Sequence, residues 1–210
     1  MSIQQPTLVA AAAQDLCRRL DTMNSAKPAR HHSILFGFAP WIIFDVVAGP
    51  STWKLAAFTA LVASVLLNLG DLRQRSLKLL ELAGIVFFAV ITVLAVILDR
   101  GDMLWLETYA QPLSSGVVAV VALGSLAFTP FTEQYARDET PQAYWTSPKF
   151  RRINRVLTAA WGCAFLVIAI LGLIAIHAPG HSDWYNWVLP IVLLVAAIKF
   201  TSWYPKHAAK

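Results

Sequence analysis

The sequence predicts an all-α, polytopic membrane protein with about six transmembrane helices, and three observations predict it. Only 14% of the 210 residues are charged and 57% are hydrophobic, whereas a soluble domain typically carries about 25% charged residues. The uncharged residues are gathered in long runs, and about 20 apolar residues are what a helix needs to cross a hydrocarbon layer of ~30 Å. The Lys and Arg residues fall mainly in alternate segments between these runs.

The first predicted span, residues 34–48, is the weakest of the six. It is short and Pro40 interrupts it, so a re-entrant segment is its main alternative. It also contains Asp45, and a carboxylate inside an apolar stretch is costly in a bilayer and is usually paired or functional. The second predicted span, residues 53–69, follows after a short turn and begins beside Lys54.

Four further spans are predicted from runs that contain no charged residue. The predicted spans cover residues 79–98, 112–128, 156–176 and 187–203, and the first and last of them extend beyond their uncharged runs to include Glu81 and Lys199. The longest internal loop, about residues 129–155, lies before the fifth span, and Pro141 and Pro148 are expected to break any helix in it. Ser147 followed by Pro148 is typical of a helix start, with Ser as N-cap and Pro at the first helical position.

The distribution of basic residues predicts the orientation. If both termini are cytoplasmic, 15 of the 17 Lys and Arg residues fall on the inner side, and only Lys54 and Arg100 fall outside. Such a bias towards the cytoplasm is the main determinant of membrane topology. The net charge of +5 therefore needs no nucleic acid as a partner, and anionic lipids of the inner leaflet are the natural counterpart of the basic segments.

The chain divides into an N-terminal cytoplasmic or interfacial segment, residues 1–30, and a single transmembrane domain, residues 31–210. Within the segment, Leu8, Ala12, Leu16 and Leu20 recur every four residues, which favours an amphipathic helix on the membrane surface, with a frayed tail as the alternative. Positive charge follows this apolar run instead of preceding it, so it is not a signal peptide.

The candidate functional residues are polar groups in or beside the spans: Asp45, Lys54, Asn68 and Glu81. At 1.5 Å per residue, Asp45 is expected roughly 18 Å from the inner end of its span and Glu81 about 5 Å from the inner end of the third, too far apart for a paired acid–base site. We expect Asp45 to form an ion pair with Lys54, and Glu81 to meet basic residues near it. In the alternative interpretation, Asp45, Asn68 and Glu81 line the path of a small transporter, with Pro40 breaking the first helix.

A second set of candidates is basic and is expected to face lipids or protein partners. It consists of Arg73, Arg75, Lys78, Arg151, Arg152 and Arg155. No catalytic motif is present, and Cys17, Cys163 and five scattered His residues give no metal-ligand spacing. We therefore expect no catalytic site, no metal and no cofactor, and a protein that is not an enzyme.

Four stretches, in this order, resemble the intracellular septation protein A family of bacterial inner-membrane proteins. They are FAPWIIFDVVAGPSTWKLAAFTALVASVLL, LAGIVFFAVITVLAVILDRGDMLWLETYAQP, FRRINRVLTAAWGCAFLVIAILGL and DWYNWVLPIVLLVAAIKF. The likeness covers about residues 35–207. The sequence departs from the family pattern in its first 30 residues, in the long loop before the fifth span, and in the seven-residue separation of Asn154 and Trp161.

The resemblance implies a divergent member located in the bacterial inner membrane. It also implies a non-enzymatic role in envelope integrity and in septation or cell division, exerted through lipids, membrane protein partners or a homo-oligomer, and no cofactor. A small transporter or lipid-handling protein, with Asp45 and Glu81 lining a polar path, is the alternative function.

Overall fold

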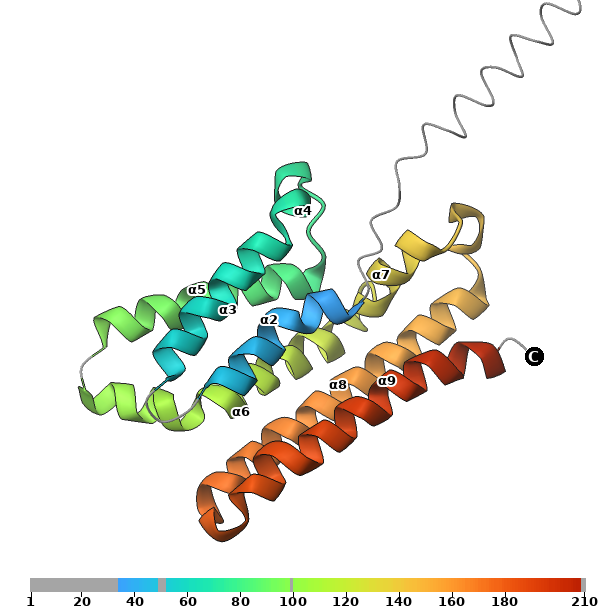
Figure 1. The fold of residues 1–210 in the computed structure, drawn as a ribbon. Coiled ribbons are helices and arrows are strands. Elements are labelled where there is room, and N and C mark those ends of the chain that lie inside the picture. Colours follow the sequence, from blue (N-terminus) through green and yellow to red (C-terminus); the bar gives the residue numbers. More distant parts are fainter. Residues whose placement is uncertain (1–33, 49–51, 99, 209–210) are drawn as a thin grey trace, which may run out of the picture. The chain divides into compact units, whose positions relative to one another are not determined.

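The computed structural model describes residues 34–48, 52–98 and 100–208, so the prediction for residues 1–30 lies outside the described residues. The described residues belong to one compact unit, His32–Lys210. Their regular structure is helical, in the order α2 (Ile34–Val47), α3 (Trp53–Leu67), α4 (Leu69–Gln74), α5 (Leu79–Ile97), α6 (Arg100–Ser125), α7 (Phe131–Glu139), α8 (Pro148–His177) and α9 (Leu189–His207). A π-helical turn, Trp184–Val188, leads directly into α9 (Figure 1).

Three segments are long and apolar enough to cross a membrane: Leu79–Ile97, Pro148–His177 and Trp184–His207. Helices α2 and α3 are apolar but have only 14 and 15 residues, or about 21–23 Å at 1.5 Å per residue. Helix α6 has 26 residues, but charged residues are concentrated in its first two turns. The all-helical fold class and the presence of membrane-length apolar helices are thus confirmed.

Several boundaries differ from those predicted. Helix α2 continues through Pro40, so the interruption expected there is not found. Helix α6 begins at Arg100 instead of residue 112 and contains Pro112. The loop at residues 129–155 contains α7, which the sequence analysis did not predict, whereas the predicted start of α8 is confirmed: the Ser147 hydroxyl accepts a hydrogen bond from the Phe150 N–H at 3.2 Å, and Pro148 is the first helical residue.

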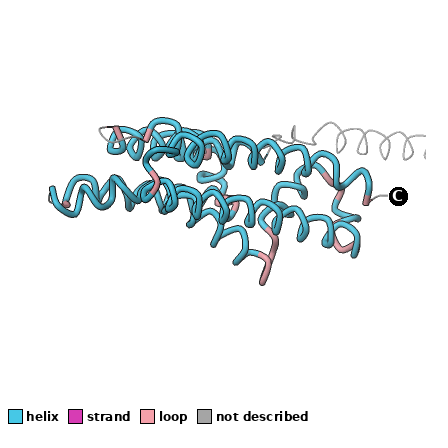
Figure 2. Tube along the Cα trace, turned by 90° about the horizontal axis from the view of Figure 1, so that it is seen from below, coloured by secondary structure: helices cyan, strands magenta, loops and turns pink. Residues whose placement is uncertain are grey.

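Helix α2 packs against α3 and α5 and also contacts α6, while α8 packs mainly against α6 and α9. Figure 2 shows these helices running alongside one another, with the connecting loops at their ends. Small residues allow the close approach that helix association without a hydrophobic driving force requires. Ala56, Ala57 and Ala60 on one face of α3 are fully buried. A Cβ on Gly162 of α8 would lie 2.6 Å from Leu123 Cδ2 of α6.

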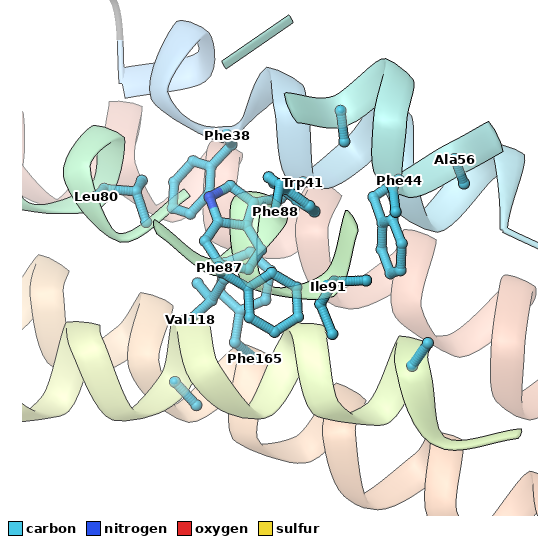
Figure 3. Packing of buried hydrophobic residues seen from close by; sticks show 14 of the residues in the cluster. Phe38, Trp41, Phe44, Ala56, Leu80, Phe87, Phe88, Ile91, Val118 and Phe165 are labelled. Carbon is cyan, nitrogen blue, oxygen red and sulfur yellow. The ribbon is translucent and has the colours of Figure 1, made fainter. Parts of the chain in front are cut away.

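The interior is filled by aromatic rings. We use the term aromatic layer for Phe38, Trp41 and Phe44 of α2 with Phe87 and Phe88 of α5, Phe131 of α7, and Trp161 and Phe165 of α8. Figure 3 labels the α2 and α5 rings and Phe165. Phe38 stacks on Trp161 and Phe165 at ring-centroid distances of 4.7 and 5.1 Å, and Trp41 stacks on Phe87 at 5.2 Å. The three α2 rings recur at every third position, so this helix brings the α5 rings and the α8 rings into one core.

The faces turned away from this core are apolar as well. On α5 the exposed side chains include Val86, Val90, Val93, Val96 and Ile97, the last two 81% and 66% exposed. In the apolar window of the Trp184–His207 segment, only 6% of the residues are buried within the protein. A water-soluble monomer rarely exposes contiguous apolar surface on this scale.

Candidate functional site

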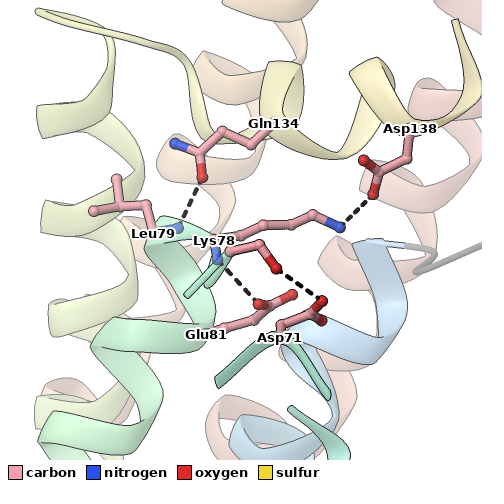
Figure 4. Close-up of polar contacts among 7 residues, drawn as sticks. Asp71, Lys78, Leu79, Glu81, Gln134 and Asp138 are labelled. Carbon is pink, nitrogen blue, oxygen red and sulfur yellow. Dashed lines mark hydrogen bonds and ion pairs between the residues drawn. The ribbon is translucent and has the colours of Figure 1, made fainter. Parts of the chain in front are cut away.

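Polar residues gather where α4, the start of α5 and α7 meet. We call Asp71, Lys78, Glu81, Gln134, Tyr135 and Asp138 the polar cluster; Figure 4 shows all of them except Tyr135 with a label. Backbone groups also take part in its hydrogen bonds. The Leu79 N–H donates to Gln134 Oε1 at 2.8 Å, and the Ser76 N–H donates to the Asp71 carbonyl at 2.9 Å. The first bond joins the start of α5 to α7, which lies 55 positions away in the sequence, and the second closes the end of α4.

Lys78 is the central cation of the polar cluster. Its Nζ lies 2.6 Å from Asp138 Oδ2 and 4.3 Å from the centre of the Tyr135 ring, a cation–π geometry. The Lys78 side chain is only 10% exposed, against 36% for Asp138. The prediction that Lys78 faces lipids or partners is therefore wrong, because its charge is used between α5 and α7.

Glu81 is buried and lies next to Tyr135. Its Oε2 accepts a hydrogen bond from the Lys78 N–H at 3.0 Å, and so caps the start of α5. Burial, followed by the neighbouring Glu81 carboxylate, raises the pKa of Tyr135 well above its ordinary value of 10.0. Tyr135 therefore stays neutral over the physiological pH range and acts as a buried hydroxyl, not as a charged group.

A second set of hydrogen bonds joins α7 to α8. The Thr132 hydroxyl donates to the Asn154 carbonyl at 2.9 Å and lies 2.8 Å from the Thr158 hydroxyl. The Asn154 side chain donates to the Phe150 carbonyl at 2.9 Å. Further along α8, Trp161 Nε1 donates to Thr201 Oγ1 of α9 at 2.9 Å. Asn154 and Trp161 thus have identifiable structural roles.

The other predicted basic residues are exposed. Arg73 and Arg75 belong to α4 and its C-cap, where Arg75 adopts a left-handed conformation with φ 54°. Arg151, Arg152 and Arg155 lie in the first two turns of α8. The α5–α7–α8 contacts described above bring these two groups to the same end of the helices. Their exposure is what a lipid-facing or partner-facing role requires.

The remaining predicted residues are dispersed. Asp45, near the end of α2, has its Oδ1 3.0 Å from the Ser114 hydroxyl that donates to it, while Lys54 is exposed. The predicted Asp45–Lys54 ion pair is therefore wrong: a neutral hydroxyl of α6 takes the place of the cation. Asn68 is buried, and its side chain donates to the Ser64 carbonyl one turn earlier at 2.8 Å, which closes the end of α3.

Two hollows lie beside these residues. A partly open cavity of about 160 Å³ adjoins Asp45, Gln111 and Ser115 and is also lined by residues of α8, of the π-helical turn and of α9. A larger and more open groove, about 410 Å³, lies near the start of α8 and includes Thr132, Asn154 and Trp161. The six predicted basic residues are absent from the walls of both. Among the described residues, no group of three or more His, Cys, Asp or Glu side chains is placed to hold a metal ion.

The residues that sequence reasoning missed are mainly those of α7. Its sequence FTEQYARDE does carry a signal, because Phe131 and Tyr135 are one turn apart, as are Glu133 and Arg137, whose ion pair spans 2.6 Å. Pro141 and Pro148, which follow α7, predict a loop over the whole segment and so obscure this helical pattern. Ser114 could not have been identified as the partner of Asp45, since the two are separated by 69 positions.

In comparisons with known proteins, the chain matches no family model, no curated protein and no solved structure.

Proposed function

We propose that the chain is a multi-pass protein of the bacterial inner membrane, with six spans formed by α2, α3, α5, α6, α8 and α9 and with both termini in the cytoplasm. The observation that carries this proposal is the apolar surface on the outward faces of the helices, exemplified by Val96 and Ile97, since hydrocarbon is the environment in which such a surface is stable. The exposed Arg residues of α4 and α8 would then lie at the cytoplasmic boundary.

Within the membrane, we propose a non-enzymatic role in envelope integrity and in septation or division, exerted through anionic lipids or membrane protein partners. The ordered resemblance to the septation protein A family supports this role. The filled packing between α2, α3 and α5, in which Ala56, Ala57 and Ala60 of α3 are fully buried, also supports it, because rigid packing suits a protein that presents surfaces to others. Arg151, Arg152 and Arg155 provide an exposed basic surface for that purpose.

A small transporter or lipid-handling protein is the second candidate, and the cavity beside Asp45 favours it. A polar path shared by Asp45 and Glu81 does not have the same support. Asp45 lies near the end of α2, whereas Glu81 adjoins Tyr135, whose hydroxyl lies against Gly37 near the start of α2. Between them, the rings of Trp41, Phe44 and Phe88 fill the interior.

Cysteine labelling tests the topology. In a chain with Cys17→Ser and Cys163→Ser, single cysteines are introduced as Arg73→Cys, Arg152→Cys and Asp102→Cys, all at exposed positions. An impermeant maleimide applied to intact spheroplasts should label only the Asp102→Cys protein, and all three should react after the membrane is opened. Labelling of Arg73→Cys and Arg152→Cys from opposite sides would contradict the six-span proposal.

Complementation tests the role in the envelope. In cells lacking the protein, the triple change Arg151→Gln, Arg152→Gln and Arg155→Gln should fail to restore normal septum placement and detergent resistance. The matched control, with Lys at all three positions, keeps the positive charge and should restore both. A deletion strain with normal division and a normal envelope would contradict the proposed role.

A further inference from the structure

The cavity beside Asp45 combines one carboxylate with mostly apolar walls. Its volume is about 160 Å³. Helices α2, α6 and α8 supply three of its sides, and the π-helical turn and the start of α9 supply the fourth. A buried apolar cavity of about 150 Å³ holds a molecule of the size of benzene. This cavity is partly open, so a group of about five or six heavy atoms fits within it while the rest of a larger molecule remains outside.

The Asp45 carboxylate has capacity for another donor. An ionised carboxylate offers about four lone-pair sites, and within the described residues it receives one hydrogen bond, from Ser114. Gln111, also on the cavity wall, is held by a different bond, because its Nε2 donates to the Asp45 backbone carbonyl at 2.8 Å. The α6 side chains thus fix the end of α2 and leave carboxylate oxygen for a ligand.

The π-helical turn brings Tyr185, Asn186 and Trp187 to the cavity. Isolated π-helical turns cost more than regular helix and recur at functional sites, because they alter the direction of side chains. Here Tyr185, Asn186 and Trp187 line the same cavity as Asp45 but from a different side. A carboxylate together with aromatic rings is the combination that recognises an organic ammonium group.

We propose that this cavity binds a primary ammonium group on a short carbon chain, from either a free alkylamine or the headgroup of phosphatidylethanolamine. A bare metal ion fits less well, since six or more oxygen ligands suit such ions and the walls are largely Phe165, Ile168, Pro190 and Leu194. The headgroup source rests on the proposed membrane location, whereas binding of a free amine does not.

In the first experiment, the full chain is placed in phosphatidylcholine nanodiscs and titrated with n-butylamine hydrochloride. Calorimetry measures the binding, and NaCl of equal ionic strength serves as the blank. The second uses nanodiscs that also contain phosphatidylethanolamine and phosphatidylglycerol, and native mass spectrometry identifies the lipid retained by the protein. Binding of butylamine alone identifies a free amine as the source, and selective retention of phosphatidylethanolamine identifies the headgroup.

Asp45→Asn should weaken either interaction by about tenfold or more, because it removes the charge and keeps the shape. Asp183→Asn is the matched control: it removes an exposed carboxylate that adjoins the π-helical turn but is not part of the cavity wall, and it should bind as the wild type does. Equal binding by Asp45→Asn and the wild type would overturn the proposal.

If Asp45→Asn does not fold, the wild-type protein alone still tests whether the cavity binds an ammonium group. It should retain phosphatidylethanolamine in preference to phosphatidylcholine, whose ammonium carries three methyl groups. It should also prefer phosphatidylethanolamine to phosphatidylglycerol, which has no ammonium group. Failure to bind butylamine together with equal retention of the three lipids would overturn the inference. The topology assigned by cysteine labelling would be unaffected by that result.

Discussion

Tyr135 illustrates how much a single side chain contributes to this fold. Its ring carries the Lys78 cation–π contact, and its hydroxyl lies near Glu81 and against Gly37. The absence of a side chain at Gly37 is what makes room for that hydroxyl, because a Cβ there would also lie 2.9 Å from Tyr135 Cζ and 3.3 Å from Leu80 Cδ2. One residue of α7 thus connects α2 with α5.

Gly37→Ala should destabilise the protein by about 1–3 kcal/mol, because the added methyl group overlaps the Tyr135 ring in a filled interior. Gly124→Ala is the control: nothing lies within 4 Å of a Cβ at that position of α6, so helix propensity alone should make the change neutral or slightly stabilising. Thermal unfolding in detergent measures both. Equal melting temperatures for Gly37→Ala and the wild type would show that Tyr135 can move aside.

The raised pKa of Tyr135 predicts a dependence of stability on pH. Since the folded protein holds this proton more tightly than the unfolded chain, the contribution is complete below about pH 10, the ordinary pKa of Tyr, and is lost as the pH rises above it. The free energy of unfolding should fall more steeply above pH 10 for the wild type than for Tyr135→Phe. Near pH 8 the free energies of unfolding of the two proteins should change with pH at the same rate. Equal slopes above pH 10 as well would contradict this assignment.

Hydrogen bonds near the starts of α5, α7 and α8 join these three helices to one another. Pattern and composition predicted α5 and the N-cap of α8, because these depend on neighbouring residues such as Ser147 and Pro148. The same reasoning failed for α7, whose nine residues are stabilised by contacts to α5 and α8, such as Gln134 to the Leu79 N–H. A short polar helix is marginal without such packing, so local sequence indicates it only weakly.

Ser147→Ala should cost about 1 kcal/mol of stability by removing the bond that the Phe150 N–H donates. Thr146→Ala, at the exposed neighbouring position, removes a similar side chain outside the cap and should have little effect. Chemical denaturation followed by tryptophan fluorescence compares the two variants. A loss for Thr146→Ala as large as that for Ser147→Ala would refute the capping role.

The link between α5 and α7 is tested by a double-mutant cycle on Lys78 and Asp138. Lys78→Met leaves Asp138 without its cation, Asp138→Asn removes the carboxylate charge, and the double variant lacks the ion pair altogether. Because the Lys78 side chain is only 10% exposed, we expect a coupling free energy of about 0.5–3 kcal/mol. Strictly additive losses in the free energy of unfolding would show that the two charges do not interact.

Across the whole molecule, α2 contacts α3, α5 and α6, and its Phe38 ring reaches α8. The sequence indicated its apolar character, but its length and Pro40 suggested the weakest span, whereas the structure packs it against α3, α5 and α6. Its central place depends on which of its rings meet α5 and which meet α8, and contacts between distant segments are not encoded in local periodicity. For the same reason Lys54 was assigned to Asp45 from proximity in sequence, while the structure supplies Ser114.

Phe38→Ala should destabilise the protein by about 3–5 kcal/mol, because it removes a buried ring that stacks on both Trp161 and Phe165. Phe128→Ala provides the control, since that ring is 91% exposed and its loss leaves no internal cavity. The melting temperature in detergent should fall for the first variant only. A small effect of Phe38→Ala would show that the stacking of Phe38 on the α8 rings contributes little to stability.

The aromatic layer has a consequence for permeability. An ion that reached Asp45 with its hydration shell could not travel along α2 towards Glu81 without losing that water, because Trp41, Phe44 and Phe88 are almost wholly buried and offer no comparable solvation. If the chain spans a membrane as proposed, the acidic groups near both ends of this helix therefore do not form a continuous path for ions across it.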